Sequence, residues 1–99
     1  VQAAISGVDG AIGSTYNVNG KTSKKIFELA KEGKVEEAYE LQHKANDVIE
    51  KVLELGLYQT LKEILKVKGI DAGYCKKPMK VFDPEKLPEV EKLVKDYNL

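Results

Sequence analysis

The stretch that decides the fold is the glycine-rich run Gly7-Val8-Asp9-Gly10-Ala11-Ile12-Gly13-Ser14-Thr15-Tyr16-Asn17-Val18-Asn19-Gly20. Between residues 8 and 15 it is short, poor in charge and rich in glycine, as a buried strand of a parallel sheet tends to be. Its small side chains would let a neighbouring group or a ligand approach the backbone closely. Residues 16–20 carry the Asn and Gly residues typical of a turn. We therefore expect a thin strand at 8–15 followed by a turn.

The hydroxyl pair at the end of this expected strand, Ser14 and Thr15, has two interpretations. Barrel and open α/β enzymes place ligand contacts at the C-terminal ends of their strands, so either hydroxyl could bind a ligand. Simple capping of the strand end explains the pair equally well. Nucleotide binding is weakly supported, because no Gly-Lys-Ser/Thr closes the run and it is not a Gly-x-Gly-x-x-Gly leading into a helix.

The sequence on either side of this run predicts helices. Residues 1–5 have the small apolar side chains that suit the last turns of a helix. Downstream, apolar residues recur at spacings of three and four, and glycines follow each run. The predicted helices run from an N-cap at Thr22 or Ser23 to Gly33, from Val35 to about Leu55, from Leu57 to Gly69, and from the entry signals Asp83-Pro84 and Leu87-Pro88 to about Tyr97. Between Ile70 and Asp83 there is no helical stripe, so we expect an extended connection.

One strand followed by four helices is an incomplete fold. A lone strand has unpaired N–H and C=O groups on both edges, which a stable protein does not normally leave uncovered. The chain also starts at Val1 without an initiator methionine, as if a helix were entered midway. We therefore expect a piece of a longer protein. The alternative is a complete small protein whose methionine was removed.

Composition and charge disfavour several classes of function. The 99 residues are 42% hydrophobic and 32% charged, as in ordinary globular proteins. Sixteen basic residues balance sixteen acidic ones, so no overall charge favours nucleic acid or an anionic membrane. No apolar run approaches the ~20 residues that a membrane-spanning helix needs. The single cysteine, Cys75, cannot form an internal disulfide, which together with the N-terminal sequence indicates a reducing cytoplasm.

The run from Gly7 to Gly20 closely resembles the eighth-strand segment of the N-acetylneuraminate lyases, the sialic acid aldolases of the dihydrodipicolinate synthase and N-acetylneuraminate lyase family. The resemblance covers almost the whole chain and fades after about Val81. It includes Ile26-Phe27-Glu28-Leu29, Leu41-Gln42-His43 with Asn46-Asp47, Gly56-Leu57-Tyr58-Gln59-Thr60 with Lys62-Glu63, and Asp71-Ala72-Gly73-Tyr74-Cys75-Lys76-Lys77-Pro78-Met79. Dihydrodipicolinate synthases typically lack the Gly-Ser-Thr-Tyr-Asn sequence of residues 13–17, which favours the sialic acid branch.

The resemblance implies the α/β class: a C-terminal fragment of a (β/α)8 TIM barrel that is itself mostly α-helical. Residues 1–33 would supply the last barrel strand, a substrate-side loop and the following helix, and residues 34–99 a C-terminal helical extension. The complete enzyme would be a cytoplasmic tetramer that reversibly cleaves N-acetylneuraminate to N-acetylmannosamine and pyruvate. It would use a Schiff base on a lysine of the sixth strand. That lysine and the other catalytic groups match positions before Val1, so the resemblance implies no catalytic residue in this chain and no activity of the chain alone.

What the resemblance carries over to this chain is one wall of the substrate site. Gly13 and Ser14 match positions that line the site, and the Ser14 hydroxyl would hydrogen-bond the polyhydroxylated part of the substrate. The backbone carbonyl of Ile12 matches one that lies beside the Schiff-base lysine. Bulky side chains at Gly10 or Gly13 would obstruct a ligand lying across the strand end. The implied partners are the N-terminal part of the barrel, the small-molecule substrate and other copies of the full-length enzyme, without a cofactor.

Other residues with reactive side chains give weaker indications. His43 lies in a predicted helix without a second His or Cys at ligand spacing, so a structural or surface role is favoured over a metal site. Cys75 has Lys76 and Lys77 beside it, and such neighbours can make a thiol more reactive. The absence of a His or Cys partner nevertheless disfavours a redox role. An independent aldolase with its own amine nucleophile, such as Lys21, has no support in the sequence.

A non-catalytic function belongs to a different class and is also open. The apolar stripes of the predicted helices would have no core partner in an isolated chain. They would then be buried by self-association, which would make the chain a helical assembly module.

Overall fold

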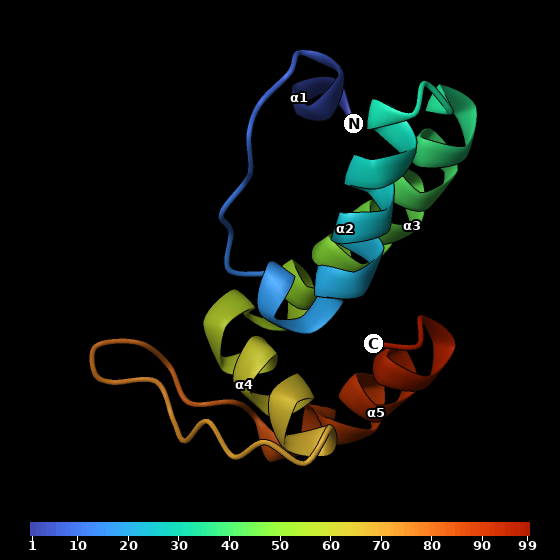
Figure 1. The fold of residues 1–99 in the computed structure, drawn as a ribbon. Coiled ribbons are helices and arrows are strands. Elements are labelled where there is room, and N and C mark those ends of the chain that lie inside the picture. Colours follow the sequence, from blue (N-terminus) through green and yellow to red (C-terminus); the bar gives the residue numbers. More distant parts are fainter. The chain divides into compact units, whose positions relative to one another are not determined.

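In the computed structural model, which describes residues 1–99, the chain forms five α-helices, one short 3-10 helix and no β-strand (Figure 1). The elements are α1 (Gln2–Ile5), α2 (Tyr16–Lys31), α3 (Val35–Leu55), α4 (Leu57–Val67), η1 (Pro84–Lys86) and α5 (Leu87–Asp96). The chain divides into two compact units, Val1–Asp47 and Val48–Leu99, so that α3 contributes to each of them. The expectation of a mostly α-helical chain is confirmed.

The predicted helix ends at glycines are confirmed, and two of them share one geometry. Gly33 has a φ of 80°, and the next N–H, that of Lys34, donates to the Leu29 carbonyl at 2.9 Å. This is the Schellman arrangement, in which a residue with positive φ lets the chain turn back onto the last carbonyls of a helix. Gly69, with a φ of 92°, repeats it after α4. Gly56 separates α3 from α4 as predicted.

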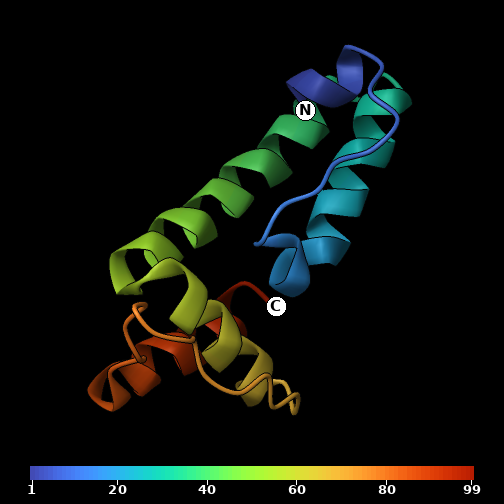
Figure 2. The same cartoon turned by 90° about the vertical axis from the view of Figure 1, so that its left-hand side faces the viewer.

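In the first unit, the short helix α1 packs against α2. Ala4 of α1 is buried in one cluster with Leu29, Ala30 and Ala38, and the partly buried side chains around them are Val1, Phe27 and Leu41. From α1 the chain returns past the length of α2 to reach its first turn (Figures 1 and 2). Residues 8–15 lie in this connecting segment between α1 and α2.

The strand predicted at residues 8–15 is absent, and this prediction is wrong for the 99-residue chain. Residues 8–13 are irregular, and residues 14 and 15 form a turn. A strand needs neighbours to share its ladder hydrogen bonds, and this chain has no other strand to supply them. The turn predicted at residues 16–20 is also wrong, because α2 already begins at Tyr16 with Thr15 at its cap position. Thr22 and Ser23 therefore lie inside α2 instead of capping it.

In the second unit, α4 packs against α5. The side chains of Ile64 and Val90 are completely buried, with 0% exposure. Residues 70–83 form the predicted extended connection, which runs out from the end of α4 and returns to η1 (Figure 1). The predicted helix entry at Asp83-Pro84 is confirmed, because the Asp83 carboxylate accepts a hydrogen bond from the Glu85 N–H at 3.0 Å.

A buried hydroxyl in α4 has no partner. Thr60 is 0% exposed and its Oγ1 makes no hydrogen bond, a situation that costs roughly 1–3 kcal/mol. Thr60→Val keeps the branched shape and removes the hydroxyl, so it is expected to raise the free energy of unfolding by about 1 kcal/mol in urea denaturation. Thr22→Val, at a half-buried position, is the matched control and should change stability by less than about 0.5 kcal/mol. A loss of stability in Thr60→Val would show that the hydroxyl has a partner after all.

Candidate functional site

The backbone of residues 9–12 makes no hydrogen bonds within the chain. The turn after α1 closes when the Val8 N–H donates to the Ala3 carbonyl at 3.3 Å. From Asp9 to Ile12, no backbone N–H or C=O takes part in a hydrogen bond. The Ile12 side chain is fully exposed, at 102% of its reference area. The Ile12 carbonyl, which the resemblance places beside a catalytic lysine, is thus free to meet a partner.

The next residues form a turn that fixes the backbone of Ser14. The Tyr16 N–H donates to the Gly13 carbonyl at 3.2 Å, and the Asn17 N–H donates to the Ser14 carbonyl at 3.3 Å. The same Ser14 carbonyl accepts a second hydrogen bond, from the Asn17 side-chain Nδ2 at 2.9 Å. None of the hydrogen bonds in the structure involves the Ser14 hydroxyl. The turn therefore holds the Ser14 main chain and leaves its hydroxyl available.

The absence of a side chain at Gly13 has a local reason. A Cβ built at this position would lie 3.3 Å from Cε2 of the Tyr16 ring, which is tighter than most real contacts. At Gly10, a Cβ would meet nothing within 4 Å. A side chain at Gly13 would require the Tyr16 ring to shift slightly, whereas one at Gly10 would require no such shift. At Gly10 any restriction would have to come from a ligand or from groups outside the chain.

The start of α2 contains a break that the sequence did not predict. Asn19 has non-helical dihedral angles, φ −123° and ψ 27°, and is buried at 5% exposure. Its Oδ1 accepts a hydrogen bond from the Ser23 hydroxyl at 3.2 Å. Residues 16–19 thus form a short first turn that is offset from the rest of α2. Ile12, Gly13 and Ser14, the three predicted site residues, lead directly into it.

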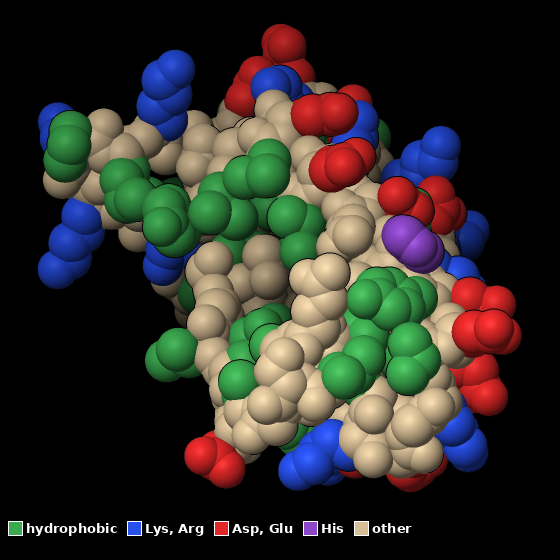
Figure 3. All heavy atoms as spheres, turned by 90° about the horizontal axis from the view of Figure 1, so that it is seen from above, with side chains coloured by type: hydrophobic (Ala, Val, Ile, Leu, Met, Phe, Trp, Pro, Cys, Tyr) green, Lys and Arg blue, Asp and Glu red, His purple; other side chains and the backbone are tan.

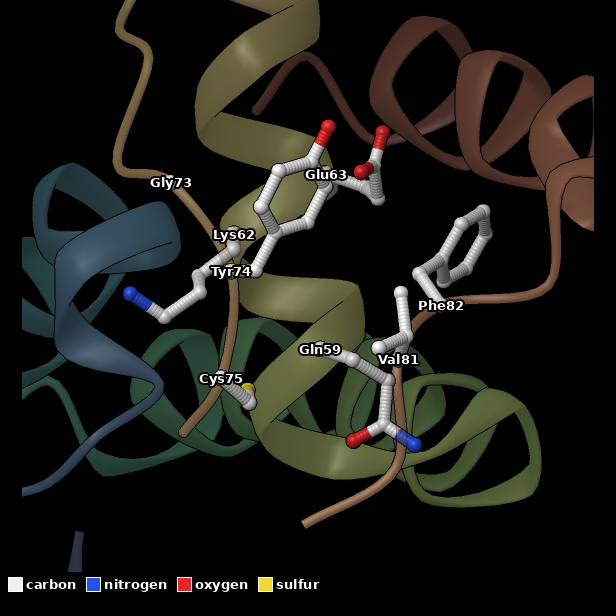
Figure 4. A pocket seen from close by; sticks show the side chains of 8 residues that line it. All are labelled: Gln59, Lys62, Glu63, Gly73, Tyr74, Cys75, Val81 and Phe82. Atoms are coloured by element: carbon white, nitrogen blue, oxygen red, sulfur yellow. The ribbon is translucent and has the colours of Figure 1, made fainter. Parts of the chain in front are cut away.

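A small hollow lies beside α4 in the second unit (Figure 4). Its volume is about 10 Å³, which is room for roughly one water molecule. The Lys62 amine donates to the Ala72 carbonyl at 2.8 Å and so ties the extended connection to α4. The hollow is too small for a sugar or a keto acid. It is lined by Gln59, Lys62, Glu63, Gly73, Tyr74, Cys75, Val81 and Phe82.

The remaining candidates lie apart from any site. His43 is exposed on α3 (Figure 3). Its ring centroid lies 6.4 Å from that of Tyr39. Cys75 is a free thiol that lines the small hollow. No three His, Cys, Asp or Glu side chains come together as a metal site would require. Measured by length and hydropathy together, no helix here could cross a membrane.

Comparison with known proteins identifies the family. The model of the dihydrodipicolinate synthetase family matches residues 1–97. The chain belongs to the dihydrodipicolinate synthetase family. Among solved members, it is similar to N-acetylneuraminate lyase from Fusobacterium nucleatum, with 55% identity and a TM-score of 0.91 over 97% of this chain and 33% of that one. Residues 13–17, Gly-Ser-Thr-Tyr-Asn, favoured the sialic acid branch of the family. The solved relatives of the chain do include N-acetylneuraminate lyases.

Two further solved structures of this kind extend the comparison. A Clostridium difficile protein, solved in complex with mannosamine, is 48% identical with a TM-score of 0.92, over 97% of this chain and 33% of that one. N-acetylneuraminate lyase from Mycoplasma synoviae is 35% identical with a TM-score of 0.85, over 94% of this chain and 32% of that one. The Fusobacterium nucleatum enzyme has also been solved in complex with pyruvate. The chain spans about a third of the length of the structures that it matches.

Proposed function

We propose that this chain forms the C-terminal third of an N-acetylneuraminate lyase, a Schiff-base aldolase that reversibly cleaves N-acetylneuraminate to N-acetylmannosamine and pyruvate. The observation that carries the proposal is the 55% identity to N-acetylneuraminate lyase from Fusobacterium nucleatum over 97% of the chain. The amine that forms the Schiff base, and the groups that shuttle protons, belong to the other two thirds of the enzyme. Alone, the 99 residues are expected to be inactive.

In this proposal, residues 8–15 become the last strand of the barrel. The support is their open backbone, since residues 9–12 have every N–H and C=O unpaired within the chain. Neighbouring strands would supply the missing ladder partners. The exposed Ile12 side chain would then be buried against the rest of the barrel. Its carbonyl would lie beside the Schiff-base lysine.

The residues at the end of this strand would form one wall of the substrate site. Ser14 supports this role because its hydroxyl is unpaired while its backbone is held in place. It would hydrogen-bond the polyhydroxylated part of the substrate. Gly13, which has no side chain, would leave room for the ligand. Residues 34–99 would form the helical extension that supports subunit contacts in a cytoplasmic tetramer.

A direct test joins residues 1–97 to the first two thirds of the Fusobacterium nucleatum enzyme and measures pyruvate release from N-acetylneuraminate. We expect activity within about tenfold of the parent enzyme, a span that corresponds to about 1.4 kcal/mol of transition-state stabilisation. The parent enzyme lacking its last third is the control and should release no pyruvate. Borohydride reduction in the presence of pyruvate should label a peptide outside residues 1–97. A joined enzyme that folds and assembles but releases no pyruvate would contradict the proposal.

A second function, self-association of the isolated chain, is favoured by one specific observation. Several large apolar side chains are exposed, including Ile12 at 102%, Tyr74 at 71% and Val81 at 64%. Exposed apolar groups of this kind promote assembly when no other partner covers them. Analytical ultracentrifugation of the 99-residue chain decides the point, because a soluble monomer at high micromolar concentration would exclude obligate self-association.

A further inference from the structure

The loop that leads into α2 lies against the first turn of that helix. A Cβ built at Gly13 would lie 3.3 Å from Cε2 of the Tyr16 ring. The side-chain amide of Asn17 donates to the Ser14 carbonyl at 2.9 Å and so ties the backbone of Ser14 to the helix. This arrangement is local and involves no residue outside 13–17.

The Ser14 carbonyl makes hydrogen bonds within the chain, whereas the Ser14 hydroxyl makes none. Its carbonyl accepts two, one from the backbone N–H of Asn17 at 3.3 Å and one from the Asn17 Nδ2. Its hydroxyl makes none. A side chain whose rotation is free but whose main chain is held by a neighbour is suited to present a polar group to a ligand at a defined position. Asn17 is the residue that adds to this hold beyond what the helical turn supplies.

We propose that Asn17 is a positioning residue that acts through Ser14: its amide fixes the Ser14 carbonyl, and thereby the place from which the Ser14 hydroxyl meets the hydroxylated part of the substrate. The inference rests on the proposed function of this chain as part of an N-acetylneuraminate lyase. It goes beyond that function by adding a residue whose side chain does not itself contact the ligand. One hydrogen of the Asn17 Nδ2 is used in the hydrogen bond to Ser14.

The kinetic test uses the joined enzyme and the variants Asn17→Ala and Asn17→Asp, the second of which keeps the shape and removes the donor. Both are expected to raise KM for N-acetylneuraminate about 3- to 10-fold, the range produced by losing one hydrogen bond, with kcat within about twofold. In the direction of synthesis, KM for N-acetylmannosamine should rise by a similar factor and KM for pyruvate should not change. A variant that merely loosens the fold would raise KM for both N-acetylmannosamine and pyruvate.

A double-mutant cycle shows whether Asn17 acts through Ser14. If it does, Asn17→Ala added to Ser14→Ala should change KM by less than about 1.5-fold beyond Ser14→Ala alone, because coupled residues are not additive. Independent, multiplicative effects would overturn the proposal. Asn46→Ala is the matched control, because Asn46 is also an exposed asparagine with a side-chain hydrogen bond, 3.1 Å from Gln42, but on α3. It should leave both KM values unchanged.

A second measurement is made on the 99-residue chain itself and does not depend on catalysis. Asn17→Ala is expected to lower the protection of the residue 17 N–H from hydrogen exchange, after correction for the intrinsic rate of the new sequence, by about 3-fold or more relative to the N–H groups of α3, because the turn loses one of the two hydrogen bonds that hold the Ser14 carbonyl. Unchanged exchange would overturn the positioning role. If exchange changes as expected but the joined enzyme with the unaltered sequence is inactive, the proposed function fails and the local role of Asn17 stands.

Discussion

Replacing Ile64 with alanine is expected to lower the free energy of unfolding by about 2–5 kcal/mol. Ile64 lies in α4, which packs against α5, and its side chain is 0% exposed. The substitution removes buried carbon atoms and leaves a cavity that the neighbouring side chains fill only in part. Domains of this size have about 5–15 kcal/mol of stability in total, so the loss would be a large share. Urea denaturation followed by circular dichroism measures it.

The matched control is the same substitution at Ile70, which lies in the extended connection and is 56% exposed. Ile70→Ala should change the free energy of unfolding by less than about 0.5 kcal/mol. Equal effects at the two positions would mean that Ile64 does not belong to a packed core. In the joined enzyme Ile70 could acquire a partner. The comparison is therefore made on the 99-residue chain.

Gly56→Ala is the substitution with the second largest expected effect, a loss of about 1–3 kcal/mol. Gly56 joins α3 to α4 with φ 103° and ψ 114°, a conformation that residues with a Cβ rarely adopt. A Cβ there would also collide with the Gln59 side chain. Because the backbone conformation is the main cause, the double variant Gly56→Ala, Gln59→Ala should recover little stability. Full recovery would show that the side-chain contact was the cause.

Gly20→Ala is expected to raise the free energy of unfolding, whereas Gly56→Ala is expected to lower it. Gly20 is the first residue of α2 after the break at Asn19, and a Cβ there would meet nothing within 4 Å. Alanine is favoured over glycine inside a helix by about 0.5–1 kcal/mol, so at this end position the free energy of unfolding should rise by up to about 0.5 kcal/mol. If both glycine substitutions destabilised the chain equally, the special conformation of Gly56 would not explain its effect. Denaturation curves recorded side by side make the comparison.

The helices could be predicted from the sequence because their determinants are local. The spacing of apolar residues between Val35 and Leu55 depends only on neighbours within one or two turns. Gly33 and Gly69 end their helices through the φ of a single residue. The strand at 8–15 could not be judged in this way, since a strand exists only when another segment pairs with it. Its glycines and apolar residues are typical of a buried strand, and these 99 residues include no other strand that could pair with it.

The site residues remain a prediction, and the hydrogen bond that holds one of them was not predicted. The resemblance to a family indicated Ile12, Gly13 and Ser14, and the structure places them at the entry to α2. The hydrogen bond from Asn17 to Ser14 could not be predicted, because it depends on α2 being capped at Thr15, at least seven residues before the predicted cap at Thr22 or Ser23. The Asn-Gly pair at residues 19–20 was interpreted as a turn. Its effect appears inside α2, where Asn19 departs from helical dihedral angles.

The unpaired backbone of residues 9–12 has a consequence for the order of folding. Helices form from contacts close in sequence on a timescale of roughly a microsecond, whereas pairing between distant segments must first close long loops. In the complete enzyme we therefore expect α2, α3 and α4 to be formed before residues 9–12 find their neighbours. Gly13 and Ser14 follow directly in the chain. Because Asn17 of α2 holds Ser14, the turn at these two residues would be in place before the strand that leads to it is paired.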